Sequence, residues 1–228
     1  MRIVELFSSK QGEGLWTGTE SVFVRVGGCP LRCRFCDTPY ASRDLVEGED
    51  LAVEEIVGRV LLSSRRHVVI TGGEPMIYAE IIPLTEQLET LGHVITVETA
   101  GILELPVRCH LMSISPKLSN STPVGKPEVL VRRHELNRNR PEIVQKLIKT
   151  YPYQLKFVID TPHDIEEMEA YLSQFAGILP ERVLLMPQGV TPQEMLDREA
   201  WITSYCLQKG YVYCPRMQII WYGNQRGT

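Results

Sequence analysis

The amino-acid sequence predicts an α/β fold in which a parallel sheet curves into an incomplete or distorted (β/α) barrel. Short apolar runs alternate with helical patterns along the chain, as they do where parallel strands are joined by right-handed crossovers. Segments of unusual composition follow several predicted strands, and barrel folds place their active sites at these carboxyl ends. Convincing helices are fewer than strands, so a regular eightfold barrel is not expected. Residues 1–228 are expected to form a single domain.

The predicted strands rest on hydrophobic periodicity. Residues 21–26 alternate with period two, which places Val22, Val24 and Val26 on one face and Phe23 and Arg25 on the other. The other expected strands are 2–7, 67–70, 93–98, 111–114, 154–160, 182–187 and 211–220.

The predicted helices fill the intervals between the strands. Residues 50–62 fit a helix with Asp50 as a candidate N-cap. Thr191, Pro192 and Glu194 form a capping-box opening for a helix that ends near Lys209. The other expected helices are 79–92, 141–149 and 164–175. The basic segment 132–140 is expected to be a solvated loop rather than a phosphate-binding patch, and 221–228 a tail.

Composition and charge exclude several classes of protein. The chain has 228 residues, 43% of them hydrophobic, and a formal net charge of −4, which gives no reason to expect nucleic-acid binding. The first apolar run is too short for a signal peptide and carries Glu5, and no segment is long enough to span a membrane. A cytoplasmic location is expected, where thiols stay reduced.

Three cysteines lie close together at Cys29, Cys33 and Cys36. A structural zinc site uses four protein ligands, whereas each iron of an iron–sulfur cluster is normally held by one cysteine. Three thiolates therefore suit a 4Fe–4S cluster with one iron left open for a small molecule. Zinc with a remote fourth ligand stays the alternative. The scattered cysteines Cys109, Cys206 and Cys214 are expected to be inert thiols.

Two motifs resemble those of the radical S-adenosylmethionine superfamily. The cysteine triplet with Phe35 matches the signature CxxxCxΦC, and "TGGEP" at 71–75 follows a strand, as the second motif of that superfamily does. In that superfamily the open iron chelates S-adenosylmethionine, and the reduced cluster cleaves it to a 5′-deoxyadenosyl radical. The resemblance therefore implies a barrel of the radical S-adenosylmethionine type and a flavodoxin- or ferredoxin-like reductant.

The chain further resembles the 7-carboxy-7-deazaguanine synthases. The shared segments are, in order, QGEG at 11–14, FVRVGGC at 23–29, CDT at 36–38, VITGGEP at 69–75, VETAG at 97–101 and SISPK at 113–117. This resemblance implies a lyase that contracts the ring of 6-carboxy-5,6,7,8-tetrahydropterin to 7-carboxy-7-deazaguanine with loss of ammonia, in queuosine biosynthesis. It also implies magnesium and a homodimer.

The resemblance assigns roles to individual residues. The cluster would be held by Cys29, Cys33 and Cys36, and magnesium by Thr38. S-adenosylmethionine would be contacted by Phe35, Cys36, Asp37, Gly73, Glu74, Ser115, Pro116 and Lys117, with a weaker match at 186–189. The substrate would be contacted by Lys10, Gln11, Gly12, Arg25, Thr71 and Thr228. Lys10 stands where related chains often have an apolar residue.

Two side chains can also be argued from their chemistry. Arg25 lies opposite the three valines of its strand, and its planar guanidinium suits a carboxylate. Glu98 ends an apolar strand, where an unpaired carboxylate would be costly, so it is expected to be hydrogen-bonded in the site.

Two other functions stay open from the sequence. A glycyl-radical-enzyme activase shares CxxxCxxC and GGEP but is not expected to carry QGEG or CDT. A non-enzymatic zinc or iron–sulfur binding module would make the motifs at the strand ends accidental.

Overall fold

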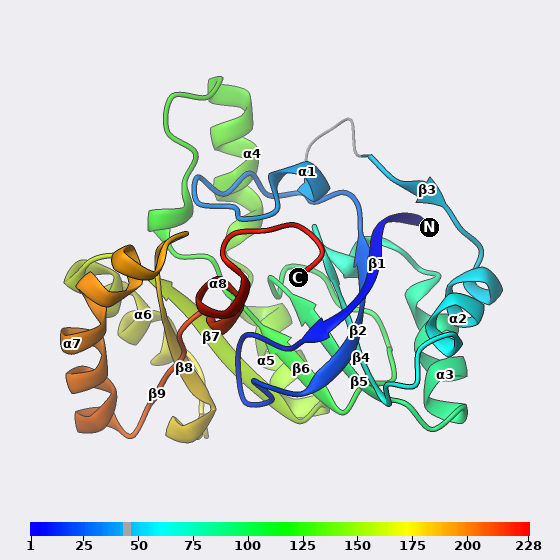
Figure 1. Cartoon of the computed structure of the whole chain (residues 1–228). Coiled ribbons are helices and arrows are strands. Elements are labelled where there is room, and N and C mark those ends of the chain that lie inside the picture. Colours follow the sequence, from blue (N-terminus) through cyan, green and yellow to red (C-terminus); the bar gives the residue numbers. More distant parts are fainter. Residues whose placement is uncertain (43–46) are drawn as a thin grey trace.

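The computed structural model describes residues 1–42 and 47–228, which are arranged around one open sheet (Figure 1). The strands are β1 (Arg2–Lys10), β2 (Glu20–Val26), β3 (Glu49–Asp50), β4 (His67–Gly72), β5 (Val94–Thr99), β6 (Leu111–Ile114), β7 (Tyr153–Ile159), β8 (Val183–Pro187) and β9 (Val212–Tyr213). The helices are α1 (Pro39–Ser42), α2 (Val53–Leu61), α3 (Ile81–Thr90), α4 (Glu128–Arg138), α5 (Pro141–Thr150), α6 (Pro162–Leu172), α7 (Pro192–Lys209) and α8 (Met217–Tyr222). Short 3₁₀ turns lie at 75–77, 119–121 and 180–182.

The sheet has nine strands in the order β3-β1-β2-β4-β5-β6-β7-β8-β9. From β2 to β9 every neighbouring pair is parallel, whereas β1 runs antiparallel to both β2 and β3. Because β3 and β9 are the two edges, the sheet curves without closing. The predicted incomplete (β/α) barrel is therefore confirmed, and the antiparallel strand at its start was not predicted.

The alternating pattern of β2 determines which face becomes core. Val22, Val24 and Val26 are fully buried in the main apolar cluster, together with Ile70 of β4 and Ile56 of α2. The helices of the crossovers cover this outer face (Figure 1). The opposite side chains of the same strands therefore point to the concave face, where they line a pocket.

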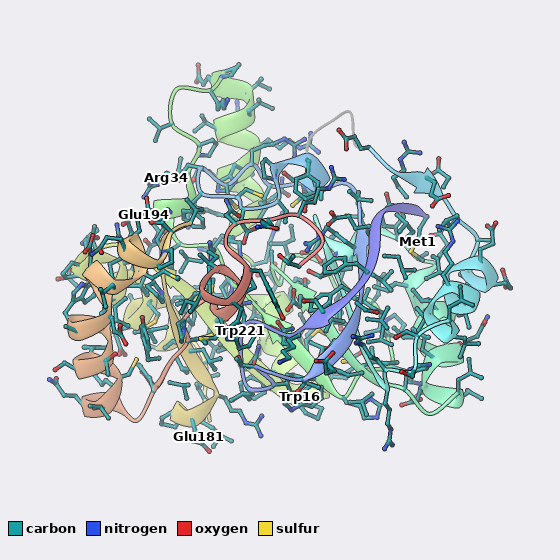
Figure 2. The ribbon with its side chains drawn as sticks, viewed as in Figure 1. Met1, Trp16, Arg34, Glu181, Glu194 and Trp221 are labelled. Atoms are coloured by element: carbon teal, nitrogen blue, oxygen red, sulfur yellow. The ribbon has the colours of Figure 1, made fainter. Side chains whose placement is uncertain are left out.

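The start and the end of α7 are determined by capping interactions between residues close in sequence. Thr191 caps α7, since its Oγ accepts a hydrogen bond from the Glu194 backbone N–H at 3.3 Å. The Glu194 carboxylate accepts in return from the Thr191 backbone N–H at 3.0 Å. Glu194 lies at the start of this helix (Figure 2), and Gly210 ends it with a φ of 72°. The predicted capping box is confirmed.

Three predictions about local structure are wrong. Asp50 does not cap α2, because it lies in β3 and pairs with Arg2, while Glu55 caps the Ala52 backbone N–H. Residues 132–138 form most of α4 rather than a loop. Residues 211–220 are not one strand, because the chain leaves the sheet after Tyr213 and forms α8.

None of the helices in the described part of the chain is long and apolar enough to cross a membrane.

Candidate active site

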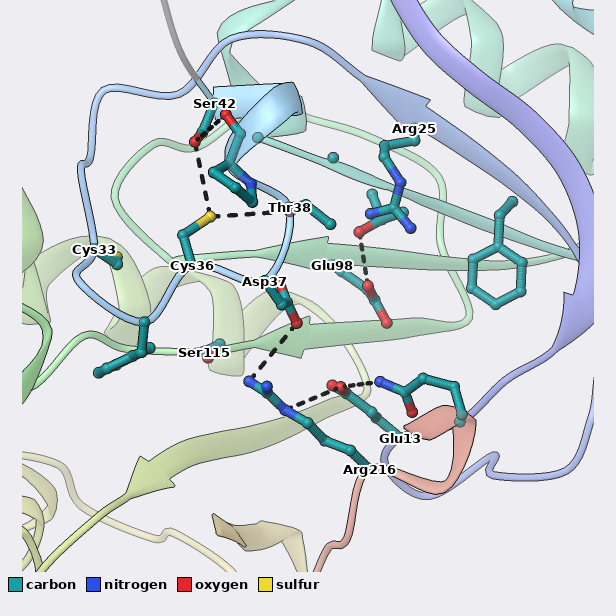
Figure 3. A pocket seen from close by; sticks show the side chains of 18 of the residues that line it. Glu13, Arg25, Cys33, Cys36, Asp37, Thr38, Ser42, Glu98, Ser115 and Arg216 are labelled. Atoms are coloured by element: carbon teal, nitrogen blue, oxygen red, sulfur yellow. Dashed lines mark hydrogen bonds and ion pairs between the residues drawn. The ribbon is translucent and has the colours of Figure 1, made fainter. Parts of the chain in front are cut away.

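A pocket of about 530 Å³ opens on the concave face of the sheet. Its wall is built from the end of β1, the loop after β2, the carboxyl ends of β4 to β8, and the last residues of the chain. Figure 3 shows these side chains converging from separate elements. The position agrees with the prediction that the unusual segments at strand ends share one site. A volume of this size is typical of a small-molecule site.

The three clustered cysteines all line this pocket. They lie in the loop between β2 and α1, residues 27–38, which we call the cysteine loop. The Cys36 sulfur is 3.7 Å from Ser42 Oγ and 4.0 Å from Thr38 Oγ1 (Figure 3). Burial, helped by the Glu74 carboxylate, raises the pKa of the Cys29 thiol to about 12. Burial also raises the pKa of Cys33 to about 11.

This donor set fits an iron–sulfur cluster. These thiols are partly buried, and thiols of raised pKa ionise when a bound cation supplies the compensating charge. Over residues 1–42 and 47–228 no group of three His, Cys, Asp or Glu side chains is arranged around a single metal ion. A cluster does not require such convergence, because each cysteine binds a different iron.

Most residues predicted to contact S-adenosylmethionine also lie in the pocket wall. These are Phe35, Cys36, Asp37, Gly73, Ser115 and Lys117. The Lys117 ammonium turns back onto its own turn and donates to Ser115 O at 2.8 Å and Ser115 Oγ at 2.7 Å. The weaker match at 186–189 contributes Met186 to the lining. Pro116 and Glu74 are not part of the wall.

Glu74 instead holds the strand ends together. Its buried carboxylate accepts hydrogen bonds from Thr99 Oγ1 at 2.7 Å, Ala100 N at 2.8 Å and Met76 N at 3.2 Å. Its backbone N–H donates to Gly28 O at 2.9 Å. Burial raises the pKa of Glu74, and these donors oppose the shift. Glu74, predicted near the cofactor, thus links the turn after β4 to the end of β5 through its side chain and to the cysteine loop through its backbone.

Gly73 has a packing role that the sequence did not indicate. A Cβ atom at this position would lie 1.9 Å from Gly28 O and 3.0 Å from Ala41 O. The backbones of the GGEP turn and the cysteine loop therefore touch directly. Glycine is required here for the approach of two protein segments.

The residues predicted to contact the substrate gather at the other end of the pocket. Lys10, Gln11, Gly12, Arg25, Thr71 and Thr228 all line it. Glu98 joins two of them, since it accepts hydrogen bonds from Gln11 Nε2 at 3.0 Å and from Thr71 Oγ1 at 2.7 Å. The prediction that Glu98 is hydrogen-bonded in the site is confirmed.

The Arg25 side chain is held in place through its Nε atom. Its Nε donates to Glu5 at 2.7 Å, and its guanidinium lies 5.7 Å from the centre of the Phe7 ring. Tyr40 donates to the same carboxylate oxygen of Glu5 at 3.0 Å. Among the described residues neither Nη group of Arg25 has an acceptor, so the outer edge of the guanidinium can receive a carboxylate.

A buried charge cluster beside these residues was missed at the sequence level. The Glu13 carboxylate forms an ion pair with Lys156, accepts from Gln218 Nε2 at 2.7 Å, and lies 3.7 Å from Arg216 Nε. Burial alone would raise the pKa of Glu13, but Lys156 and Arg216 together lower it to about 2. Arg216 also lies 3.7 Å from Asp37 of the cysteine loop (Figure 3). No local pattern in the sequence joins these residues.

The C-terminal residues complete the wall. Residues 223–228 line the pocket, and the chain ends in front of the sheet (Figure 1). Arg226 pairs with Glu5 at 2.7 Å and with Glu47 at 2.9 Å, and its guanidinium lies 4.2 Å from the centre of the Tyr40 ring. Glu5 therefore binds both Arg25 and the tail.

Comparison with known proteins identifies the family. Residues 23–112 match the model of the Radical SAM superfamily. A 7-carboxy-7-deazaguanine synthase of Rhodopirellula baltica is 43% identical over 99% of this chain and 88% of its own length. The chain belongs to the 7-carboxy-7-deazaguanine synthase family. The synthase of Pyrobaculum aerophilum is 37% identical over all of this chain and 97% of its own.

Solved structures agree with this membership. QueE from Escherichia coli superposes with a TM-score of 0.71 at 26% identity, covering 95% of this chain and 93% of that one. Streptococcus suis SuiB, solved with S-adenosylmethionine bound, shares the fold alone, with a TM-score of 0.55 at 14% identity over 84% of this chain and 45% of its own. The chain is thus a radical S-adenosylmethionine enzyme that uses a 4Fe–4S cluster and S-adenosylmethionine. Neither the activase nor the non-enzymatic binding module is favoured.

Proposed function

We propose that this enzyme converts 6-carboxy-5,6,7,8-tetrahydropterin into 7-carboxy-7-deazaguanine, with loss of ammonia. The observation that carries the proposal is that Arg25 and the Gln11–Glu98–Thr71 group share one pocket with the three cysteines. One end of the pocket therefore suits a cluster and the other a flat polar heterocycle with a carboxylate.

Arg25 binds the carboxylate of the substrate in this proposal. Glu5 uses the Nε donor and so fixes the plane of the guanidinium, which leaves two parallel N–H groups for the two oxygens. Gln11 and Thr71 contact the pterin, and Glu98 restrains both through its two oxygens. Binding in a fixed orientation is the main contribution of a protein to such chemistry.

The cluster is held by Cys29, Cys33 and Cys36. When bound, the cluster and S-adenosylmethionine supply the radical chemistry. Phe35, Asp37, Gly73, Ser115 and Lys117 position the cofactor, as their places in the pocket wall allow. The C-terminal tail and Arg226 limit access of water and other quenchers.

Thr38 provides a protein ligand to magnesium in this proposal. Its hydroxyl lies beside Cys36, and magnesium accepts one hydroxyl together with substrate oxygens and water. The expected result for Thr38→Val is a higher magnesium concentration for half-maximal activity, with an unchanged iron content. A magnesium dependence identical to that of the wild type would remove Thr38 from the site.

The remaining parts of the proposal concern the surroundings of the enzyme. The chain acts in the cytoplasm as one domain, pairs into a homodimer and receives electrons from a flavodoxin- or ferredoxin-like protein. Sedimentation of the reconstituted enzyme tests the homodimer, and a single sedimenting species at the monomer mass would exclude it.

The deciding experiment uses anaerobically reconstituted enzyme with dithionite, S-adenosylmethionine, magnesium and the tetrahydropterin. Mass spectrometry is expected to detect 7-carboxy-7-deazaguanine without net consumption of S-adenosylmethionine. A Cys109→Ser variant serves as control, because Cys109 lies outside the pocket wall. Cleavage of S-adenosylmethionine without this product would reject the substrate and favour an activase.

A further inference from the structure

Residues 29–36, the part of the cysteine loop that carries the three cysteines, are held both from within and by a neighbouring segment. This part contains no helix or strand. Within it Cys36 N donates to Cys33 O at 3.3 Å and Arg32 Nη1 donates to Cys29 O at 2.6 Å.

The backbone of the cysteine loop is also bound by the segment that follows β6. Arg32 N donates to His134 Nδ1 at 3.1 Å, and Arg34 N donates to Ser121 O at 2.9 Å. Arg34 lies at the surface beside this segment (Figure 2), and its Nε donates to Asn120 O at 2.6 Å.

His134 is the buried centre of these contacts. It comes from α4 and is completely enclosed, although α4 projects from the body of the molecule (Figure 1). Because Nδ1 accepts from the Arg32 N–H, the ring proton belongs on Nε2, which faces Ser121 Oγ at 3.0 Å. Ser121 in turn donates to Leu118 O at 2.6 Å. Every donor in this series of hydrogen bonds has an acceptor.

The chain of hydrogen bonds joins two walls of the pocket. Arg32 lies between Cys29 and Cys33, and Leu118 directly follows Lys117. A buried histidine with unpaired nitrogens would be costly, so the ring, the loop and the segment after β6 favour one arrangement. Side chains behind the ligands commonly orient them in this way.

We propose that His134 is a positioning residue for the iron–sulfur cluster, which fixes the backbone at Arg32 so that the neighbouring cysteines reach the same cluster. The proposal rests on the assignment of the cluster to Cys29, Cys33 and Cys36. An irregular loop loses conformational entropy when it binds a rigid group. His134 reduces that loss because it orders the loop before the iron arrives.

The test compares His134→Phe, His134→Asn and Ser121→Ala with the exposed control His163→Ala. Asparagine keeps an acceptor near the position of Nδ1, whereas phenylalanine removes both nitrogens. Hydrogen exchange of peptides spanning 29–36 is measured before reconstitution. Iron content, the spectrum of the reduced cluster and the rate of iron loss to a chelator are measured afterwards.

His134→Phe is expected to accelerate exchange of the loop and loss of iron about tenfold, as a buried hydrogen bond implies. His134→Asn is expected to restore exchange and iron-loss rates close to those of the wild type. The rates of Ser121→Ala are expected to lie between those of the wild type and those of His134→Phe. Exchange and iron-loss rates in His134→Phe and Ser121→Ala equal to those of His163→Ala would overturn the proposal. If the phenylalanine variant failed to fold, rates in Ser121→Ala equal to those of His163→Ala would by themselves overturn it.

The test also separates this proposal from the proposed function. Exchange and iron retention are independent of the substrate, so a failure to make the deazaguanine leaves both readouts intact. If Cys29→Ser retained a full cluster, the ligand assignment itself would be rejected.

Discussion

The ion pair between Glu13 and Lys156 yields a quantitative prediction for the substitution Glu13→Gln. The pKa of Glu13 is about 2 against an ordinary value of 4.5. Each pKa unit corresponds to about 1.36 kcal/mol, so the ionised carboxylate contributes about 3 kcal/mol to stability. The substitution also leaves the Lys156 ammonium, 7% exposed, without its partner, and breaking a buried pair costs about 3–5 kcal/mol. We expect a loss of about 3 kcal/mol at pH 7.

The same ion pair predicts how the loss of stability caused by Glu13→Gln depends on pH. Since the folded pKa of Glu13 is depressed, its contribution is complete above about pH 4.5 and is lost as the pH falls toward 2. The stability of the wild type minus that of Glu13→Gln should therefore be constant near neutrality and shrink over this acid range. Lys156, whose pKa is raised, stays charged throughout.

Urea unfolding under anaerobic conditions, followed by tryptophan fluorescence, measures both effects. Glu20→Gln is the matched control, because Glu20 pairs with Arg65 at the surface, and we expect it to cost well under about 1 kcal/mol. The double variant Glu13→Gln/Lys156→Met should recover much of the loss, since an apolar side chain tolerates burial. A loss below about 1 kcal/mol for Glu13→Gln, or strict additivity in the double variant, would refute the reasoning.

Two further predictions concern the walls of the pocket. Gly73→Ala should reduce iron content and activity at least about tenfold, because the added Cβ would lie 1.9 Å from Gly28 O. The control Gly58→Ala should leave both unchanged, because a Cβ there meets nothing within 4 Å. Equal iron contents for the two variants would contradict this prediction. Arg226→Ala removes the ion pair between the tail and Glu5. We expect the KM for the substrate to rise about tenfold and carboxypeptidase to digest the last residues faster. An unchanged KM in steady-state assays would show that the tail does not cover the site.

The sequence predicted the elements whose patterns are local. Apolar periodicity predicted the strands of the parallel sheet. A capping box predicted where the helix α7 begins. Most residues carried over from family motifs also reached one pocket. Those after β2, β4 and β6 did so because carboxyl ends of parallel strands share one edge of a sheet. Lys10, Gln11 and Gly12, which follow the antiparallel β1, and Thr228 in the tail do not follow this rule. The antiparallel start of the sheet has no such local signature.

The errors have a common physical cause. Residues 132–138 lack an apolar stripe, because α4 buries His134 against the cysteine loop rather than a hydrophobic face against the core. Asp50 is a good N-cap by type, but its pairing with Arg2 places it in β3. In each case a contact distant in sequence outweighed the local preference.

The sequence by itself determined the fold class, the cluster ligands expected from a spaced triplet, and the face of β2 that carries Arg25. Only the tertiary structure decided that Glu5 binds both Arg25 and Arg226, that Lys156 neutralises Glu13, and that His134 orders the cysteine loop. The reason is that periodicity and motif spacing reflect neighbours along the chain. A buried charge or ring takes its partner from whichever strand end the sheet brings next to it.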